Sequence, residues 1–132
     1  MKNLKSFLKP IQLNPQEIVI SNRFLDEEGN PVKFIVKPLL QEENDLLQRR
    51  FMKKTKNGLD FDQNGFLNAL VAESVIYPEL DNAELQKTYG VMKKEDLLKK
   101  MLLVGEYMKL SEAVQEINLM NEEDQLIEEA KN

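Results

Sequence analysis

A short acidic stretch near the middle of the chain has residue types and spacing that could bind a metal ion. Asp60, Asp62 and Asn64 occupy alternate positions. Gly65 follows them, and the pattern matches the first half of the calcium-binding loop of an EF-hand. Such a loop is closed by a bidentate Glu at its twelfth position. Here that position is Val71, so the residue that completes a calcium site is missing.

The same acidic residues fit the start of a helix. Asp62 or Asn64 can cap a helix that begins near Gly65, because a side-chain oxygen accepts a hydrogen bond from the free amides of the first helical turn. We therefore predict a turn and a helix cap here, with no bound metal. Weak, adventitious binding of a divalent ion at Asp60, Asp62 and Asn64 remains an alternative.

The composition removes most catalytic chemistry. The chain contains no His and no Cys, which are the usual general base, thiolate nucleophile and zinc ligands. No glycine-rich phosphate-binding motif is present among its five glycines. We therefore predict a protein that is not an enzyme and that carries no cofactor.

The charge balance also limits the partners. The 132 residues carry a net charge of −5, and both nucleic acid and anionic membrane surfaces require a cationic face. The basic run from Arg49 to Lys54 is interpreted as the C-terminal end of a helix, where positive charge is favourable. No apolar run approaches the length of a membrane span, and the N-terminus lacks the features of a signal peptide. The absence of cysteine fits a cytoplasmic protein.

The chain length predicts one domain spanning residues 1–132. Residues 1–16 are expected to form a loosely ordered arm. Residues 17–38 are expected to form a β-hairpin, because two β-branched runs flank the turn signal from Asp26 to Pro31. An isolated hairpin is only marginally stable in water, so it must pack on helices or pair with another chain.

Residues 39–120 show the spacing of amphipathic helices. Apolar residues recur there at intervals of three and four positions. The predicted helices cover 41–54, 65–76, about 82–89 and 94–103, with a last helix starting at Ser111, and the predicted breaks fall at Asn57-Gly58, Pro78, Gly90 and Gly105. Residues 121–132 form an acidic tail that is either a weak helix or frayed. The fold class is therefore α+β, with an N-terminal β-hairpin packed on a bundle of four to five short helices.

A partner-binding face is expected on the last helix and the tail. Apolar residues continue there after the core is complete, and methionine side chains adapt readily to a partner. The candidate partner-binding residues are Val114, Ile117, Met120, Leu126 and Ile127.

Four blocks of the sequence resemble the tail assembly chaperones encoded in the PBSX-like tail gene clusters of Bacillus-type phages and prophages. The blocks are Ser21–Phe24, the sequence FIVKPL at Phe34–Leu39, the stretch from Asp60 to Leu80 with its YPEL exit, and LLKKMLLVGEYMKLSEAVQEIN at Leu97–Asn118. Together they cover roughly residues 17 to 120, and their order and spacing carry the resemblance. No catalytic residue is carried over from this family.

The resemblance implies a function before the tail tube polymerises. Such chaperones are thought to coat the tape measure protein, to keep it soluble and to help recruit tail tube protein subunits. It also implies many copies, as a homo-oligomer or an open spiral, and absence from the mature virion. The alternative from a different class is a structural tail completion or connector protein of the virion. A calcium-sensing module is a third candidate, to be tested by calcium binding.

Overall fold

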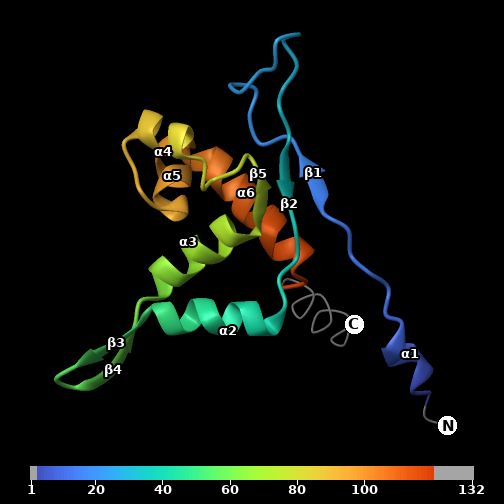
Figure 1. Cartoon of the computed structure of the whole chain (residues 1–132), viewed down its shortest axis with the longest axis vertical. Coiled ribbons are helices and arrows are strands. Elements are labelled where there is room, and N and C mark those ends of the chain that lie inside the picture. The colour runs from blue at the N-terminus through green and yellow to red at the C-terminus, as the bar shows by residue number, and fades with distance from the viewer. Residues whose placement is uncertain (1–2, 121–132) are drawn as a thin grey trace, which may run out of the picture.

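The computed structural model describes residues 3–120, and a three-stranded sheet with five helices packed beside it forms the body of this part (Figure 1). A short helix and a second, two-stranded sheet lie outside that body (Figure 1). The elements in chain order are α1 (Lys5–Leu8), β1 (Gln16–Ile18), β2 (Phe34–Val36), α2 (Gln41–Arg50), β3 (Met52–Thr55), β4 (Gly58–Phe61), α3 (Gln63–Ser74), β5 (Val75–Tyr77), α4 (Ala83–Tyr89), α5 (Lys94–Met101) and α6 (Val104–Ile117). The predicted α+β class is confirmed.

The sheet contains the predicted hairpin and one strand that was not predicted. β1 pairs antiparallel with β2, with Ile18 opposite Phe34. β5 pairs with the other edge of β2, so the strand order is β1-β2-β5. The predicted helix over 65–76 is therefore too long, because α3 ends at Ser74. The β-branched Val75 and Ile76 continue the chain as a strand, since β2 supplies the hydrogen-bonding partner there.

A second hairpin replaces the predicted end of the 41–54 helix. α2 ends at Arg50, and residues 52–55 pair with residues 58–61 as β3 and β4. Lys56 and Asn57 form the hairpin turn where a helix stop was predicted, and Gly58 begins β4 with a φ of 111°, which glycine tolerates without steric cost. Lys53 and Lys54 consequently lie on an exposed strand, and only Arg49 and Arg50 occupy the last helical turn.

The boundaries of the later helices agree with the predictions in one case and differ in another. Asn82 caps α4 by accepting a hydrogen bond from the Leu85 amide, and Gly90 ends it in the left-handed conformation, as predicted. The last helix begins at Val104 rather than at Ser111, and Gly105 lies inside it. The break falls at Leu102 and Leu103, where the backbone is extended.

The core is formed where α6 and α5 pack against the sheet and α3. Its fully buried side chains include Val36, Leu97, Leu98, Leu110 and Val114. A smaller cluster, of Leu47, Phe66, Ala69 and Leu70, joins α2 to α3. Ser74 is also buried, at the junction of α3 and β5. Among residues 3–120, no helix has the length and apolarity needed to cross a membrane.

The acidic stretch at residues 60–65 has the predicted helix cap. The carboxylate of Asp62 accepts a hydrogen bond of 3.0 Å from the amide of Gly65 at the start of α3, whereas Asp60 lies in β4. Gly65 is needed for close packing, because a Cβ atom there would overlap the Asp62 carboxylate and would lie 2.8 Å from the ring of Phe51. In the part of the chain that the structure describes, no three acidic side chains are grouped as a metal site would require.

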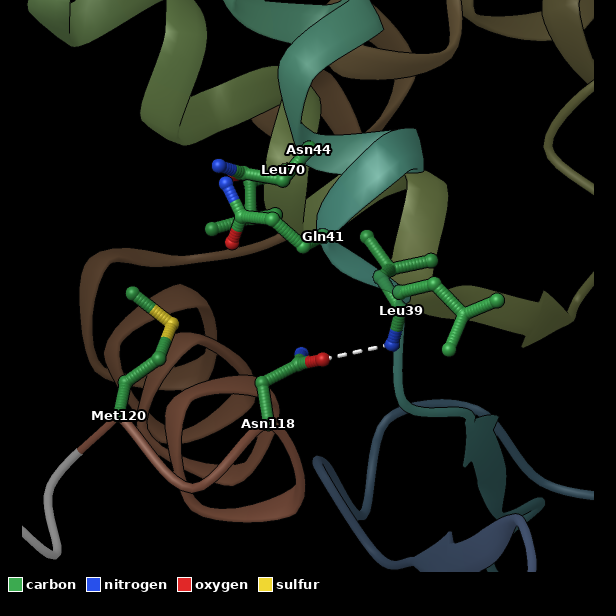
Figure 2. Close-up of a pocket in the computed structure, with 7 residues that line it drawn as sticks. Leu39, Gln41, Asn44, Leu70, Asn118 and Met120 are labelled. Carbon is green, nitrogen blue, oxygen red and sulfur yellow. Dashed lines mark hydrogen bonds between the residues drawn. The ribbon is translucent and has the colours of Figure 1, made fainter.

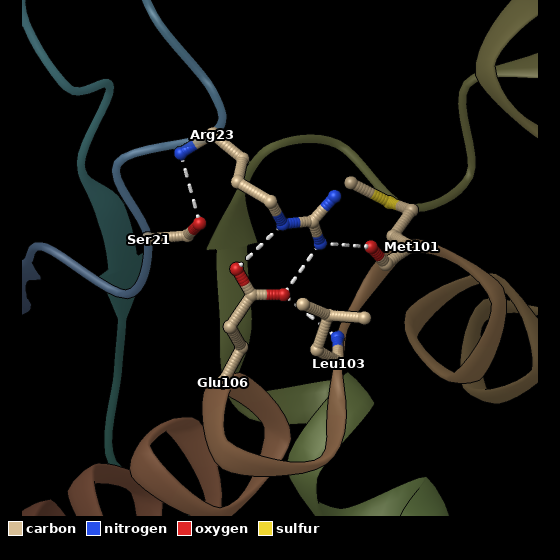
Figure 3. Close-up of polar contacts among 5 residues, drawn as sticks. All are labelled: Ser21, Arg23, Met101, Leu103 and Glu106. Atoms are coloured by element: carbon tan, nitrogen blue, oxygen red, sulfur yellow. Dashed lines mark hydrogen bonds and ion pairs between the residues drawn. The ribbon is translucent and has the colours of Figure 1, made fainter.

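An ion pair connects the segment after β1 to the start of α6 (Figure 3). The guanidinium of Arg23 donates to both carboxylate oxygens of Glu106, at 2.9 and 2.5 Å, and to the carbonyl oxygen of Met101 at 2.9 Å. Glu106 also accepts a hydrogen bond of 2.7 Å from the amide of Leu103, which closes the first turn of α6. Hydrogen bonds from Arg23, Ser21 and Leu103 lower the pKa of Glu106 to about 2.

Candidate partner-binding surface

The C-terminal end of α6 has a fixed geometry that exposes two apolar side chains. Asn118 ends the helix, and Leu119 follows with a φ of 59°, in the left-handed region. The Leu119 amide donates to Glu116 and the Met120 amide donates to Gln115. This pattern is a Schellman motif, whose left-handed position is usually occupied by glycine. The motif holds the side chains of Leu119 and Met120 at the surface, where both are exposed.

Asn118 connects this helix end to the chain before α2 (Figure 2). Its side-chain oxygen accepts a hydrogen bond of 2.6 Å from the amide of Leu39. Its side-chain nitrogen donates to the carbonyl oxygen of Val114 at 2.9 Å and lies 3.4 Å from the hydroxyl oxygen of Ser74. The side-chain amide of Asn118 thereby contacts three segments: the chain between β2 and α2, the end of α3, and the last turn of α6.

A hollow of about 250 Å³ lies between these segments. Figure 2 shows it between the end of α6 and the first turns of α2. It is lined by Leu39, Leu40, Gln41, Asn44, Leu70, Asn118 and Met120. Its size suits one large side chain of a partner rather than a cofactor, since pockets for drug-sized ligands measure about 300–1,000 Å³. We call the hollow and its exposed apolar neighbours Leu40, Leu119 and Met120 the α6-end surface.

The predicted partner-binding residues have different positions in the structure. Val114 and Ile117 are 0% and 4% exposed, so these two belong to the core and do not form a surface. They were misassigned because the sequence does not show that the inner face of α6 packs against β2 and α3. Met120 is 47% exposed and lines the hollow, so it stays a candidate. Leu126 and Ile127 lie outside the described residues.

Among the residues of the α6-end surface, sequence reasoning named only Met120 as a candidate. Leu39 and Leu40 both line the hollow, although the sequence analysis gave neither a part in partner binding. Leu119 was not singled out, because a single sequence does not show that a leucine adopts the left-handed conformation. The sequence does contain two consecutive apolar residues, Leu119 and Met120, directly after Asn118.

The fold and this surface define a small α+β protein with a small hollow beside exposed apolar side chains at the end of α6. Comparison with known proteins then identifies its family. The family model for the phage XkdN-like tail assembly chaperone protein matches residues 4–131. The chain therefore belongs to the XkdN-like phage tail assembly chaperone family, and the resemblance seen in the sequence is confirmed.

Two relatives from Bacillus subtilis (strain 168) match nearly the whole chain. The phage-like element PBSX protein XkdN is 32% identical over 131 residues, which covers 94% of this chain and 88% of the relative. The uncharacterized protein YqbN is 31% identical and covers 95% of this chain and 90% of the relative. A crystal structure of YqbN has a TM-score of 0.76 to this fold at 29% identity, and covers 89% of this chain and 97% of that one.

Proposed function

We propose that this chain is a non-enzymatic chaperone that binds the tape measure protein of a phage or prophage tail. In this proposal it keeps that protein soluble in the host cytoplasm and helps to recruit tail tube subunits before polymerisation. Family membership supports the general role. The observation that carries the specific proposal is the α6-end surface. Its small hollow is lined by apolar and polar side chains and opens beside the exposed Leu40, Leu119 and Met120, so it suits a single side chain from a helix with an apolar stripe.

The composition of the surface supports reversible binding. Met120 is a flexible side chain that can repack around different partners. Leu40 and Leu119 provide apolar contact beside the hollow, and Gln41 and Asn44 supply polar groups that can pair with a partner's main chain or side chains. A chaperone that is displaced during assembly needs such a modest, adaptable interface rather than a large and permanent one.

Co-expression with the tape measure protein from the same gene cluster tests the proposal. We expect the chain to raise the soluble yield of the tape measure protein and to co-purify with it. The variant Met120→Lys should reduce both effects, because it places a charge at the rim of the hollow. Met92→Lys is a matched control, since Met92 is 91% exposed on a different part of the molecule. An unchanged yield and no co-purification with the unmodified chain would contradict the proposal.

A structural protein of the virion, acting in tail completion or as a connector, is the alternative role. Mass spectrometry of purified particles separates the two. A chaperone should be missing from mature particles, whereas a completion or connector protein should be found at a fixed copy number.

A further inference from the structure

A second hollow lies at the base of the β3–β4 hairpin, where α2 ends. Its volume is about 450 Å³, and it is lined by Asp45, Gln48, Arg49, Met52 and Phe61. We call it the hairpin-base hollow. Figure 1 shows the β3–β4 hairpin projecting beyond the ends of α2 and α3. Because its volume is nearly twice that of the hollow of the α6-end surface, it can receive more than one aliphatic side chain.

The β3–β4 hairpin extends this hollow with further apolar surface. Met52 is paired with Phe61, and Lys54 is paired with Leu59. Side chains alternate along a strand and directly paired residues share a face, so these four lie on one face of the hairpin. Met52 is 42% and Leu59 is 68% exposed. Since two strands alone are only marginally stable in water, we expect a further segment to cover this face.

The charge around the hollow indicates the chemistry of that segment. Residues 49–56 contain five basic residues and no acidic one. Arg50 forms an ion pair of 3.4 Å with Glu95. Within residues 3–120, no ion pair involves the other four, which are Arg49, Lys53, Lys54 and Lys56. Asp45 is the one acidic residue that lines the hollow. The surface therefore suits a segment that combines acidic and apolar side chains.

One face of α2 connects the hairpin-base hollow with the hollow of the α6-end surface. Gln41 and Asn44 line the hollow at the end of α6, whereas Asp45 and Gln48 line the hairpin-base hollow. These four positions are spaced by three, four and seven residues, so they lie on the same face of the helix. The ten residues of α2 span about 15 Å, which sets the distance between the two hollows.

The acidic tail, residues 121–132, starts at one end of this face. Met120 lines the hollow at the end of α6, and the tail follows it directly. The tail contains five acidic residues and one basic residue, and Leu126 and Ile127 stand between its two acidic groups. Leu126 is six residues after Met120, a reach of about 20 Å in an extended chain. That reach is enough to pass along α2 to the hairpin-base hollow.

We propose that the acidic tail docks along this face of α2 in the same molecule and places Leu126 and Ile127 in the hairpin-base hollow. The acidic residues on either side of this apolar pair then lie near the basic residues of 49–56. The hairpin-base hollow is thus an internal docking site for an acidic and apolar segment. The contact does not depend on tape measure binding, because it needs only this chain.

Paramagnetic relaxation in the full chain tests the proposal. The chain has no cysteine, so Ala130→Cys provides a single site for a nitroxide spin label. In a ¹⁵N-labelled sample, the amide signals of Met52 and Leu59 should broaden. Those of Glu28 and Asn30, in the turn between β1 and β2, should not. No broadening at Met52 and Leu59 would overturn the proposal.

A mixed sample identifies the molecule that supplies the tail. Spin-labelled copies without ¹⁵N are mixed with ¹⁵N-labelled copies that carry no spin label. The signals of Met52 and Leu59 should stay sharp in this mixture, because the tail docks on its own chain. Equal broadening in the mixed sample would show that the tail of a second copy occupies the hollow, and the proposal would then be wrong.

Two double variants of the spin-labelled chain separate the apolar contribution from the charged one. Leu126→Ser with Ile127→Ser removes the apolar pair, and Arg49→Glu with Lys54→Glu reverses two charges beside the hollow. Each should lower the broadening rate at Met52 by about threefold or more. The first variant leaves every described residue unchanged, so its effect does not depend on whether the charge reversal disturbs the fold.

The matched control for the charge reversal is Lys99→Glu with Lys109→Glu. Both lysines are exposed on other helices, and Lys99 lies in the last turn of α5 as Arg49 lies in the last turn of α2. This control should leave the broadening rate at Met52 unchanged. An equal loss in the control, or no loss in either test variant, would overturn the proposal.

Discussion

Arg23 and Glu106, which are 83 positions apart in the sequence, form a bidentate ion pair. The pair fixes the segment after β1 against the junction between α5 and α6, because Arg23 also donates to the carbonyl oxygen of Met101. Arg23 belongs to the Ser21–Phe24 block that contributed to the family resemblance, so the ion pair gives that block a structural role. It positions the hairpin relative to α6, whose far end carries the α6-end surface.

The lowered pKa of Glu106 predicts an acid-dependent stability. A carboxyl whose pKa falls on folding stabilises the folded state above its unfolded pKa of about 4.3, and this contribution is lost as pH falls toward about 2. The variant Glu106→Gln should therefore be less stable than the unmodified chain at pH 7, and the difference should shrink between those two pH values. Urea unfolding at several pH values measures it.

The matched control for this prediction is Glu17→Gln. Glu17 lies 3.8 Å from Lys33, and both side chains are more than half exposed. Such surface pairs contribute little, so this variant should unfold almost as the unmodified chain does. A Glu106→Gln variant with no pH-dependent difference would show that the Arg23–Glu106 pair does not stabilise the fold.

Gly65 is closely surrounded and Gly105 is not, so alanine at these two positions should have opposite effects on stability. Gly65→Ala should destabilise the protein by about 1–3 kcal/mol, because the added methyl group would overlap the Asp62 carboxylate and the Phe51 ring. Gly105→Ala should be neutral or stabilising by up to about 1 kcal/mol, since Gly105 lies in α6 with no atom within 4 Å of the added carbon. Chemical denaturation compares the two, and equal effects would contradict the packing role of Gly65.

The role of Asp62 as a helix cap predicts its mutational behaviour and its response to calcium. Asp62→Ala should cost about 1 kcal/mol of stability, while Asp62→Asn should cost less because an amide oxygen still caps α3. Asp60→Ala should have little effect, since within residues 3–120 its carboxylate accepts a hydrogen bond only from the adjacent Phe61 amide. Calcium at 1 mM, a concentration chosen on the scale of about 10⁻³ M for the weakest protein sites, should not raise the melting temperature. A calcium-dependent rise that Asp62→Ala abolishes would restore the metal-site interpretation.

A buried residue at the end of α6 and an exposed residue just after it should respond differently when their side chains are shortened. Ile117→Ala should destabilise the fold by about 2–5 kcal/mol, because the side chain is buried in the core. Leu119→Gly should leave stability unchanged or raise it by up to about 1 kcal/mol, since glycine adopts the left-handed conformation without strain. In the co-expression assay, however, Leu119→Gly should weaken binding of the tape measure protein. If it unfolds the chain instead, Leu119 belongs to the core.

Local signals in the sequence were reliable where neighbouring residues alone decide the structure. The Asn82 cap and Gly90 terminator of α4 were predicted because each acts within one helical turn. The Asp62 cap was predicted for the same reason. The hairpin of β3 and β4 was missed, although its Asn57-Gly58 turn signal was present, because the apolar spacing up to Phe51 suggested a longer helix.

Contacts between residues distant in sequence decided the element boundaries that the sequence did not predict. Val75 and Ile76 become a strand because β2 offers them a free edge. Glu106 rather than Gly105 or Ser111 sets the start of α6, because Leu103 and Arg23 converge on its carboxylate. Neither partnership is visible in the spacing of one segment.

The sequence by itself determined the α+β class, the family and most helices, because these depend on composition, periodicity and the order and spacing of sequence blocks along the chain. Only the tertiary structure decided which apolar residues of the last helix are available to a partner. Val114 and Ile117 are covered by β2 and α3, whereas Asn118 ends the helix and turns Met120 outward beside Leu39. Burial depends on what packs against a residue, and that information lies in other segments of the chain.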